Sequence, residues 1–303
     1  MKVAQADSPV GRTPGLRGTT SSRSSPVSSA CTASADLRKL GESSVSDMKS
    51  RMPLDRTVGA AETLERIIPE ELEGDGVTGK ATLSLHLERY QFAATMVGGG
   101  TLLDLACGVG YGTRLLADSR AELTHLTGVD LDGGAVGYAK RRYADPRITF
   151  VQANAIEFLA RSSPFDNIVS LETVEHMEDP VGFFAALVGV LKPGGVLVSS
   201  VPTTPSMDGN PHHRSDFTER SFREFGNRHG LSEVDSFCQR QPFSPWAILS
   251  GQEKRVQTSR HSLLGFYAAH PGKLLDRCWS TLRYGFENRY LTVAWKRNAV
   301  RAG

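Results

Sequence analysis

The sequence has little of several features that would indicate a particular class of protein. Its 303 residues include only 4 cysteines, none in a Cys-x-x-Cys pair, so neither a disulfide scaffold nor a zinc knuckle is indicated. Lys and Arg total 35 against 33 Asp and Glu, and the net charge of +2 argues against an obligate nucleic-acid partner. The longest apolar stretch, residues 181–191, is far short of the roughly 20 residues that cross a bilayer. These absences predict a soluble, cytoplasmic protein without membrane insertion.

The first 57 residues differ in composition from the rest of the chain. They hold nine basic and five acidic residues and are rich in Ser, Thr, Gly and Pro, without apolar periodicity. Such a segment cannot bury enough surface to offset its ordering entropy, so we expect a disordered tail over residues 1–58 and a folded domain over 59–303. Prolines and glycines would break the helix of a transit peptide, which favours a dispensable tail or an upstream extension that ends near Met48 or Met52.

Short apolar runs alternate with longer amphipathic ones from Glu62 onward, a pattern typical of βαβ units around a parallel sheet. Helices are expected at residues 81–97, 111–118, 134–143, 180–191 and 219–229. Strands are expected at residues 101–105, 127–130, 148–152, 167–171, 196–201, 233–239 and 289–296. The sequence therefore predicts an open, doubly wound α/β sheet.

Residues 243–287 lie between the last two expected strands and are too long for a simple hairpin. Their aromatic residues stand among polar ones and include Trp246, Phe266, Tyr267, Trp279, Tyr284 and Phe286. We interpret this segment as a helical cap that shapes a substrate pocket. The alternatives are a packed insertion that covers a sheet edge and a contact between the subunits of a homodimer.

A glycine-rich turn follows the first expected strand. Residues 102–112 read Leu-Leu-Asp-Leu-Ala-Cys-Gly-Val-Gly-Tyr-Gly, and the glycines Gly108 and Gly110 let backbone N–H groups approach a ligand at a helix N-terminus. The Gly-x-Gly-x-Gly spacing differs from the Gly-x-Gly-x-x-Gly of dinucleotide-binding proteins. Asp104, inside the strand, could fix this turn through backbone N–H groups, face the amino group of a cationic ligand, or be an ordinary strand-end carboxylate.

Polar side chains also follow the next two strands. Asp130 ends the second strand, where a carboxylate can accept both hydroxyl hydrogens of a ribose, whereas Asp132 is better placed to cap the following helix. Asn154 follows the third strand and could recognise the edge of an adenine, although alone it would be an ordinary turn residue.

The order of these motifs resembles that of the class I S-adenosylmethionine-dependent methyltransferases. The matching segments are residues 103–110, 128–130, 152–155, 165–172 and 191–197. The resemblance implies a Rossmann-like, seven-stranded sheet with an antiparallel last strand, and S-adenosyl-L-methionine bound at the carboxyl ends of the strands. It also implies cofactor contacts from Arg89, Tyr90, Asp104, Ala106, Gly108, Gly110, Asp130, Leu131, Asn154, Ala155 and Leu171. Arg89 and Tyr90, in a His-Leu-x-Arg-Tyr run, would hold the methionine carboxylate unless they serve as packing and surface groups.

Acidic and imidazole side chains follow the fourth strand and recur on a later loop. If residues 172–176 are helical, Glu172, Glu175 and His176 lie on one side, and His213 comes from a loop at the same end of the sheet. Two carboxylates and two imidazoles could bind Mg²⁺, Mn²⁺, Fe²⁺ or Zn²⁺. Alternatively, Glu175 and His176 cap a helix and line the pocket without a metal.

Similar Glu-x-x-Glu-His runs occur in ubiquinone-pathway O-methyltransferases and small-RNA 2′-O-methyltransferases, and the run around His213 is similar to one in bacterial sugar and secondary-metabolite methyltransferases. A hydroxyl acceptor needs a base or a metal that lowers its pKa, and His213, His176 and Glu175 are the catalytic candidates. We therefore expect an O-methyltransferase for a sugar, polyketide or phenolic small molecule. The alternatives are an RNA-terminal 2′-O-methyltransferase and a cofactor-binding, non-catalytic regulatory protein.

Overall fold

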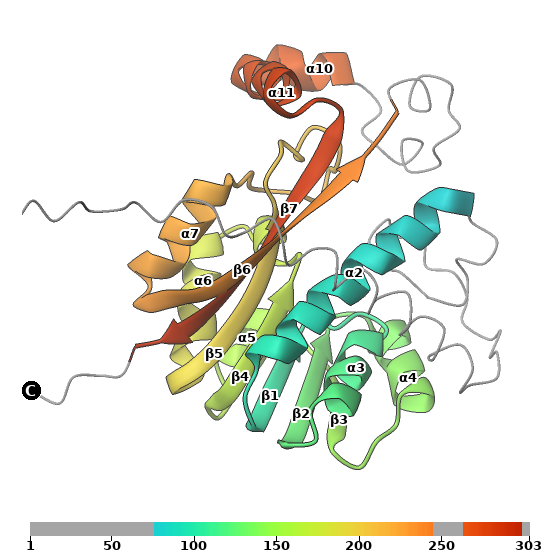
Figure 1. The fold of residues 1–303 in the computed structure, drawn as a ribbon, viewed down its shortest axis with the longest axis vertical. Coiled ribbons are helices and arrows are strands. Elements are labelled where there is room, and N and C mark those ends of the chain that lie inside the picture. Colours follow the sequence, from blue (N-terminus) through green and yellow to red (C-terminus); the bar gives the residue numbers. More distant parts are fainter. Residues whose placement is uncertain (1–75, 245–262, 299–303) are drawn as a thin grey trace, which may run out of the picture.

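The computed structural model describes residues 76–244 and 263–298, which form a seven-stranded sheet with helices on both faces (Figure 1). The strand order is β3-β2-β1-β4-β5-β7-β6. The strands are β1 Gly100–Leu105, β2 Leu123–Asp130, β3 Ile148–Gln152, β4 Phe165–Leu171, β5 Leu191–Pro202, β6 Leu231–Pro242 and β7 Glu287–Arg297.

The direction of the strands confirms the predicted fold class. Strands β1 to β5 pair in parallel, whereas β7 runs antiparallel to both β5 and β6, between which it lies. The strand order reverses direction at β1, which has β2 on one side and β4 on the other. In open α/β sheets this reversal leaves a crevice beyond the carboxyl ends of the strands, where ligands bind.

Most of the described helices lie on the two faces of the sheet, whereas the last ones lie beyond the ends of β6 and β7 (Figure 1). The described helices are α2 Gly76–Met96, α3 Tyr111–Ser119, α4 Gly133–Arg142, α5 Ala155–Leu159, α6 Pro180–Gly189, α7 Glu219–Arg228, α10 Leu263–Ala269 and α11 Pro271–Tyr284. One buried core joins α2, α3 and α4 to the sheet, and a second joins α5, α6 and α7 to the other face. Successive side chains of a strand point to opposite faces of the sheet, so each strand can contribute to both cores. In β7, Ala294 belongs to the first core and Trp295 to the second.

The expected elements all occur, with boundaries that shift by a few residues. Strand β5 begins at Leu191 rather than 196, and its pairing with β4 contains an irregularity between Phe165 and Asn167. The short helix α5 was not predicted, because its five residues are too few to show a helical period. Both α10 and α11 fall within residues 243–287, so the described part of that segment is helical.

Several predictions concern parts of the chain that the structure does not describe. The tail over 1–58 and the domain start at 59 lie outside the described residues, as do Met48, Met52 and Trp246. The predicted cap or dimer role of residues 243–287 stays a prediction. In the described ranges, 76–244 and 263–298, no helix combines the length and the apolar character needed to cross a membrane.

The packing of α2 against α3 requires a glycine. A Cβ atom on Gly112 would lie 1.9 Å from the ring of Tyr90, which is itself buried. We predict that Gly112→Ala lowers the free energy of unfolding by roughly 1 to 3 kcal/mol, because the ring must move within a filled core. Gly189→Ala is the control, because no atom lies within 4 Å of the added methyl at the end of α6. Urea unfolding of both variants measures the difference, and equal stability would contradict the packing described.

Candidate functional site

The glycine-rich loop joins β1 to α3 at the point where the strand order reverses. Ala106, Gly108 and Gly110 all have positive φ angles, of 64°, 55° and 86°. The two glycines differ in surroundings: a Cβ on Gly110 would collide with Ala139 and Phe150, whereas one on Gly108 would meet no atom within 4 Å. Gly110 therefore lets α3 pack against its neighbours, and Gly108 borders open space.

The carboxylate of Asp130 fastens this loop. Its Oδ2 atom accepts a hydrogen bond from Gly108 N at 2.8 Å, and Oδ1 accepts one from Asp132 N at 2.9 Å. Each oxygen has further acceptor capacity, so the carboxylate can also bind a diol. Asp132 caps α4 through Ala135 N, as predicted. Sequence reasoning missed that Asp130, rather than Asp104, anchors the loop.

Asp104 instead lies buried beneath the loop and is bound by hydroxyl groups. It is 1% exposed and accepts hydrogen bonds from Thr113 Oγ1 at 2.6 Å and from Tyr90 Oη at 3.2 Å. Burial raises its pKa to about 7, and the hydrogen bonds from Thr113 and Tyr90 oppose that rise. Thr113 was not predicted, because a single threonine in a helical pattern carries no recognisable signal.

Two apolar side chains are exposed beside polar groups shortly after β2 and β3. Leu131 is 68% exposed and Ile156 is 46% exposed, at the carboxyl ends of paired strands. Asn154 caps α5, whose first residue is Ala155, with Oδ1 accepting from Ile156 N at 2.9 Å. This cap occupies only the oxygen, so the Asn154 amide N–H groups can still be donated to a ligand.

Arg89 and Tyr90 point toward different parts of the sheet. Tyr90 reaches Asp104, whereas Arg89, 1% exposed, donates from Nε to Gln239 Oε1 at 2.8 Å. The Arg89 guanidinium also lies 3.8 Å from Glu172 Oε1 and 4.5 Å from the centre of the Tyr290 ring. Both residues thus have partners within the protein, and neither is a surface group; their predicted contact with the cofactor stays a prediction.

Glu172 does not join the predicted cluster of metal ligands. It follows Leu171, the half-buried last residue of β4, and has a φ of 48°. The backbone therefore changes direction at Glu172, before the turn of residues 174–176 begins. Its Oε1 atom accepts from Ser200 Oγ at 2.7 Å, and its backbone N–H donates to the same hydroxyl at 3.0 Å. The turn of residues 174–176 is a short 3-10 helix, η2, rather than the longer helix assumed from sequence.

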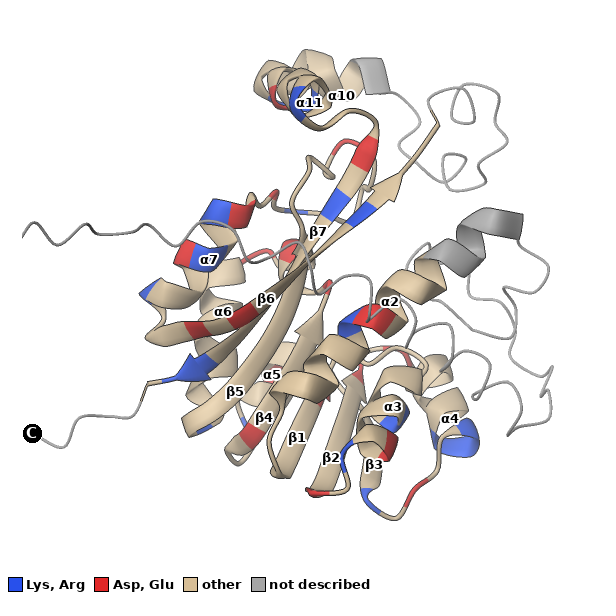
Figure 2. Ribbon diagram, viewed as in Figure 1, with Lys and Arg blue, Asp and Glu red and all other residues tan. Residues whose placement is uncertain are grey.

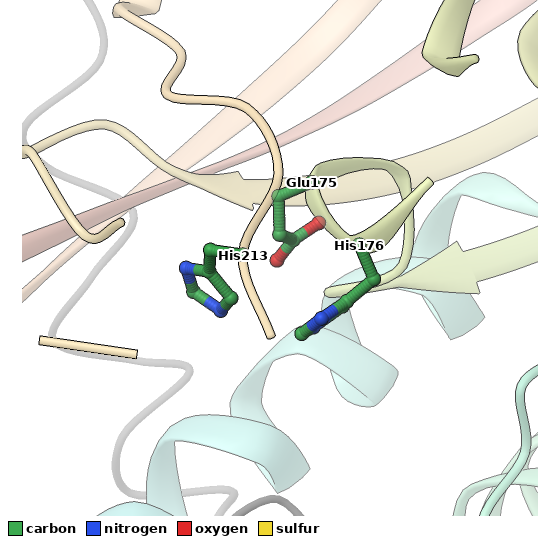
Figure 3. Close-up of side chains that lie close together, drawn as sticks. All are labelled: Glu175, His176 and His213. Carbon is green, nitrogen blue, oxygen red and sulfur yellow. The ribbon is translucent and has the colours of Figure 1, made fainter. Parts of the chain in front are cut away.

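Glu175, His176 and His213 do converge, as Figure 3 shows. A carboxylate oxygen and one nitrogen of each imidazole lie within 4.8 Å of one another, and the two rings are 4.7 Å apart at 79°. Glu175 and His176 belong to η2, and His213 to the loop between β5 and α7. Backbone hydrogen bonds from Arg214 N and Ser215 N to Glu175 O, at 2.7 and 3.1 Å, hold that loop against η2.

Hydrogen bonds involve the Nδ1 atom of each imidazole, of His176 and of His213. His176 Nδ1 lies 3.2 Å from the carbonyl oxygen of His212, and because a carbonyl only accepts, Nδ1 carries the hydrogen. His213 Nδ1 lies 2.7 Å from Ser206 Oγ. In neutral His176 the lone pair is therefore on Nε2, which suits that atom to accept a proton or bind a metal. Ser206 was not predicted, since no motif marks it.

The fold defines a class of nucleoside-binding α/β domain: a Rossmann-like sheet with an antiparallel β7 and a glycine loop where the strand order reverses. Comparison with known proteins indicates a family within this class. Residues 103–199 match the methyltransferase domain family. A probable S-adenosylmethionine-dependent methyltransferase from Mycolicibacterium smegmatis is 29% identical over 153 residues, 48% of this chain and 58% of that protein. A ubiquinone biosynthesis O-methyltransferase from Aromatoleum aromaticum is 33% identical over 100 residues, 32% of this chain and 42% of that protein. The chain thus spans about half the length of these relatives.

Solved structures share the fold at lower identity. The StiE O-MT segment superposes with a TM-score of 0.51 at 16% identity, covering 76% of this chain and 80% of its own. The (4+2) cyclase SpnF superposes with a TM-score of 0.50 at 18% identity, covering 88% and 95%. Such likeness shows the fold alone. With the domain match and the motifs described, the chain carries a class I S-adenosylmethionine-dependent methyltransferase domain.

The buried Asp104 carboxyl predicts a pH-dependent stability. Its pKa is about 7 in the folded protein, against 3.8 for an unperturbed aspartic acid, so the stability that protonation provides is full below about pH 4 and is lost as pH rises through 7. We predict that, between about pH 5 and pH 8, the wild type loses roughly 2 to 3 kcal/mol of unfolding free energy relative to Asp104→Asn. Urea unfolding at several pH values measures this, and parallel curves for the two proteins would refute it.

Proposed function

We propose that the protein transfers the methyl group of S-adenosyl-L-methionine to a hydroxyl group of a small molecule. The observation that carries this proposal is the convergence of His176, His213 and the buried Glu175 at the carboxyl end of the sheet. These groups follow β4 and β5, beside the crevice at which the cofactor loop follows β1. A proton acceptor is thus held near the place where a methyl donor would bind.

The chain's own residues fit the cofactor. Gly108 offers open backbone, and Asp130 has acceptor capacity for both ribose hydroxyls. Leu131 and Ile156 offer exposed apolar surface for the faces of an adenine, with the Asn154 amide beside them. We assign the nucleoside to this side of the crevice. The same assignment explains why two large apolar side chains lie exposed at adjacent strand ends.

The imidazoles would act on the acceptor. S-adenosyl-L-methionine supplies a methyl group on a sulfonium, which needs only an aligned nucleophile. A hydroxyl is a weak nucleophile, so the lone pair of an imidazole Nε2 atom that removes its proton strengthens it. A carboxylate within 4.8 Å, that of Glu175, favours the imidazolium that this proton transfer produces.

The same three residues also fit a divalent metal. One carboxylate and two imidazoles are the donors of the two-histidine, one-carboxylate sites that bind transition metals, and they suit Fe²⁺, Mn²⁺ or Zn²⁺ better than Mg²⁺, which prefers oxygen. A metal here would supply Lewis acidity that lowers the pKa of the acceptor hydroxyl. We include this metal in the proposal as an alternative to direct proton transfer by an imidazole.

The other two functions have weaker support. RNA-terminal methylation requires phosphate contacts, and the net charge of +2 provides no basic stripe for them. A non-catalytic role is compatible with the fold, because a fold does not determine an activity. The converging imidazoles favour catalysis over such a role, since a silent binding protein has no need of them.

We predict that Asp130→Ala weakens the binding of S-adenosyl-L-methionine roughly tenfold to hundredfold, because the variant loses both the diol acceptor and the anchor of Gly108. Isothermal titration calorimetry measures the dissociation constant. Asp118→Ala is the control, because Asp118 pairs with Arg114 on the exposed face of α3. Undiminished binding by the Asp130 variant would remove the carboxylate from the cofactor site.

We predict that His213→Ala and His176→Ala each lower kcat by roughly 10² to 10⁴ with a candidate sugar or phenolic acceptor, while affinity for S-adenosyl-L-methionine is unchanged. Exposed His125, on β2, provides the control substitution to Ala. Assays after chelation, and after adding back Mn²⁺, Fe²⁺ or Zn²⁺, distinguish direct proton transfer by an imidazole from activation of the acceptor by a metal. Activity that survives chelation supports direct proton transfer. Unchanged turnover in every condition would exclude these imidazoles from the reaction.

A further inference from the structure

The loop that carries His213 is held by the helices α10 and α11. Figure 1 shows these helices beyond the ends of β6 and β7, on the side where β5 leads into that loop. The loop occupies residues 203–217 between β5 and α7. Two of its acidic residues bind α11: Asp216 pairs with Lys273 at 2.8 Å, and Asp208 pairs with Arg277 (Figure 2 marks the charged residues).

The Asp216 carboxylate is the centre of a set of hydrogen bonds. Its Oδ1 atom accepts from Ser206 N at 2.8 Å, from Met207 N at 3.1 Å and from Ser206 Oγ at 3.2 Å, and Oδ2 accepts from Lys273 Nζ. Burial opposes ionisation of this carboxyl, but the bonds from Lys273 and the two amides outweigh it and lower the pKa. At neutral pH the group is therefore a carboxylate, which can only accept.

That charge dictates the direction of the next hydrogen bond. Because Asp216 can only accept, the Ser206 hydroxyl hydrogen points to it. The oxygen of Ser206 then presents a lone pair to His213 Nδ1, 2.7 Å away, so Nδ1 must carry the hydrogen. The series Lys273, Asp216, Ser206, His213 thus leaves the lone pair of the neutral imidazole on Nε2.

We propose that Ser206, Asp216 and Lys273 are positioning residues that fix the tautomer and orientation of His213, so that α11 takes part in preparing the imidazole for its reaction. The proposal deepens the proposed function and rests on it. An oriented tautomer matters because an imidazole with its lone pair on the wrong nitrogen neither accepts the proton of the acceptor nor binds a metal through Nε2.

A second attachment of the same loop provides a matched control. Asp208, 5% exposed, accepts hydrogen bonds from Arg277 Nε at 2.7 Å and from Tyr267 Oη at 2.5 Å, and the Arg277 guanidinium also binds the carbonyl of Pro205. None of these bonds involves Ser206 or His213. Tyr267→Phe therefore perturbs the docking of the loop on α10 and α11 and leaves the series to His213 intact.

The tautomer can be read by NMR of the full chain labelled with ¹⁵N-histidine, in which His213→Gln identifies the resonance among 8 histidines. We expect His213 to be protonated at Nδ1 in the wild type, in Ser206→Thr and in Tyr267→Phe. In Ser206→Ala we expect a shift toward the Nε2-protonated form, because that variant keeps the backbone bond to Asp216 and loses only the hydroxyl. A wild type protonated at Nε2, or a Ser206→Ala spectrum unchanged from the wild type, would overturn the proposal.

Kinetics provide the second measurement. We expect Ser206→Ala and Asp216→Asn to lower kcat roughly tenfold to hundredfold with KM for S-adenosyl-L-methionine unchanged, and Ser206→Thr to restore it. A fall in kcat without a change of tautomer would make these residues merely structural. If the wild type transfers no methyl group, the proposed function fails while the NMR spectra still decide whether the series fixes His213, so the two failures are distinguishable.

Discussion

The site depends on one carboxylate, that of Asp130, and on the two backbone N–H groups that it accepts from Gly108 and Asp132. These bonds join the end of β2 to the loop that follows β1, across the pair of strands where the ligand crevice begins. They add to the backbone hydrogen bonds of the same loop, from Cys107 N to Val129 O at 3.0 Å and from Gly110 N to Cys107 O at 3.1 Å. The surface proposed for the nucleoside is thus held in shape by hydrogen bonds within the chain itself.

Much of this arrangement could be predicted from the sequence, because local patterns of residues indicate the strands and the loop between β1 and α3. The central parallel strands β1, β4 and β5 are buried over most of their length and read as apolar runs, and the glycine loop and Asp130 stand at fixed places at the ends of β1 and β2. The resemblance to a known family added the antiparallel β7, which no local pattern indicates. The helix α5 was missed because its five residues are too few to show a helical period, and only the hydrogen bond from Ile156 N to Asn154 Oδ1 reveals that Asn154 caps it.

The parts that could not be predicted depend on distances between segments far apart in the chain. Residues 172–176 were assumed to form one helical turn, but the positive φ of Glu172 turns its side chain toward Ser200, 28 residues later. Ser206, Asp216 and Lys273 carry no motif, and their relation to His213 arises only when α11 docks on the loop. A sequence can indicate which residue types perform chemistry, whereas the groups that orient them come from tertiary packing.

The position of β7 has a consequence for how the chain folds. It is the last described strand, yet it lies between β5 and β6, and β6 pairs with no other described strand. During synthesis, therefore, the apolar edge of β5 stays uncovered and β6 has nothing to join until residues 287–297 leave the ribosome. Contacts of such long sequence separation slow folding, so a chain truncated before residue 287 would be prone to aggregate through the bare edge of β5.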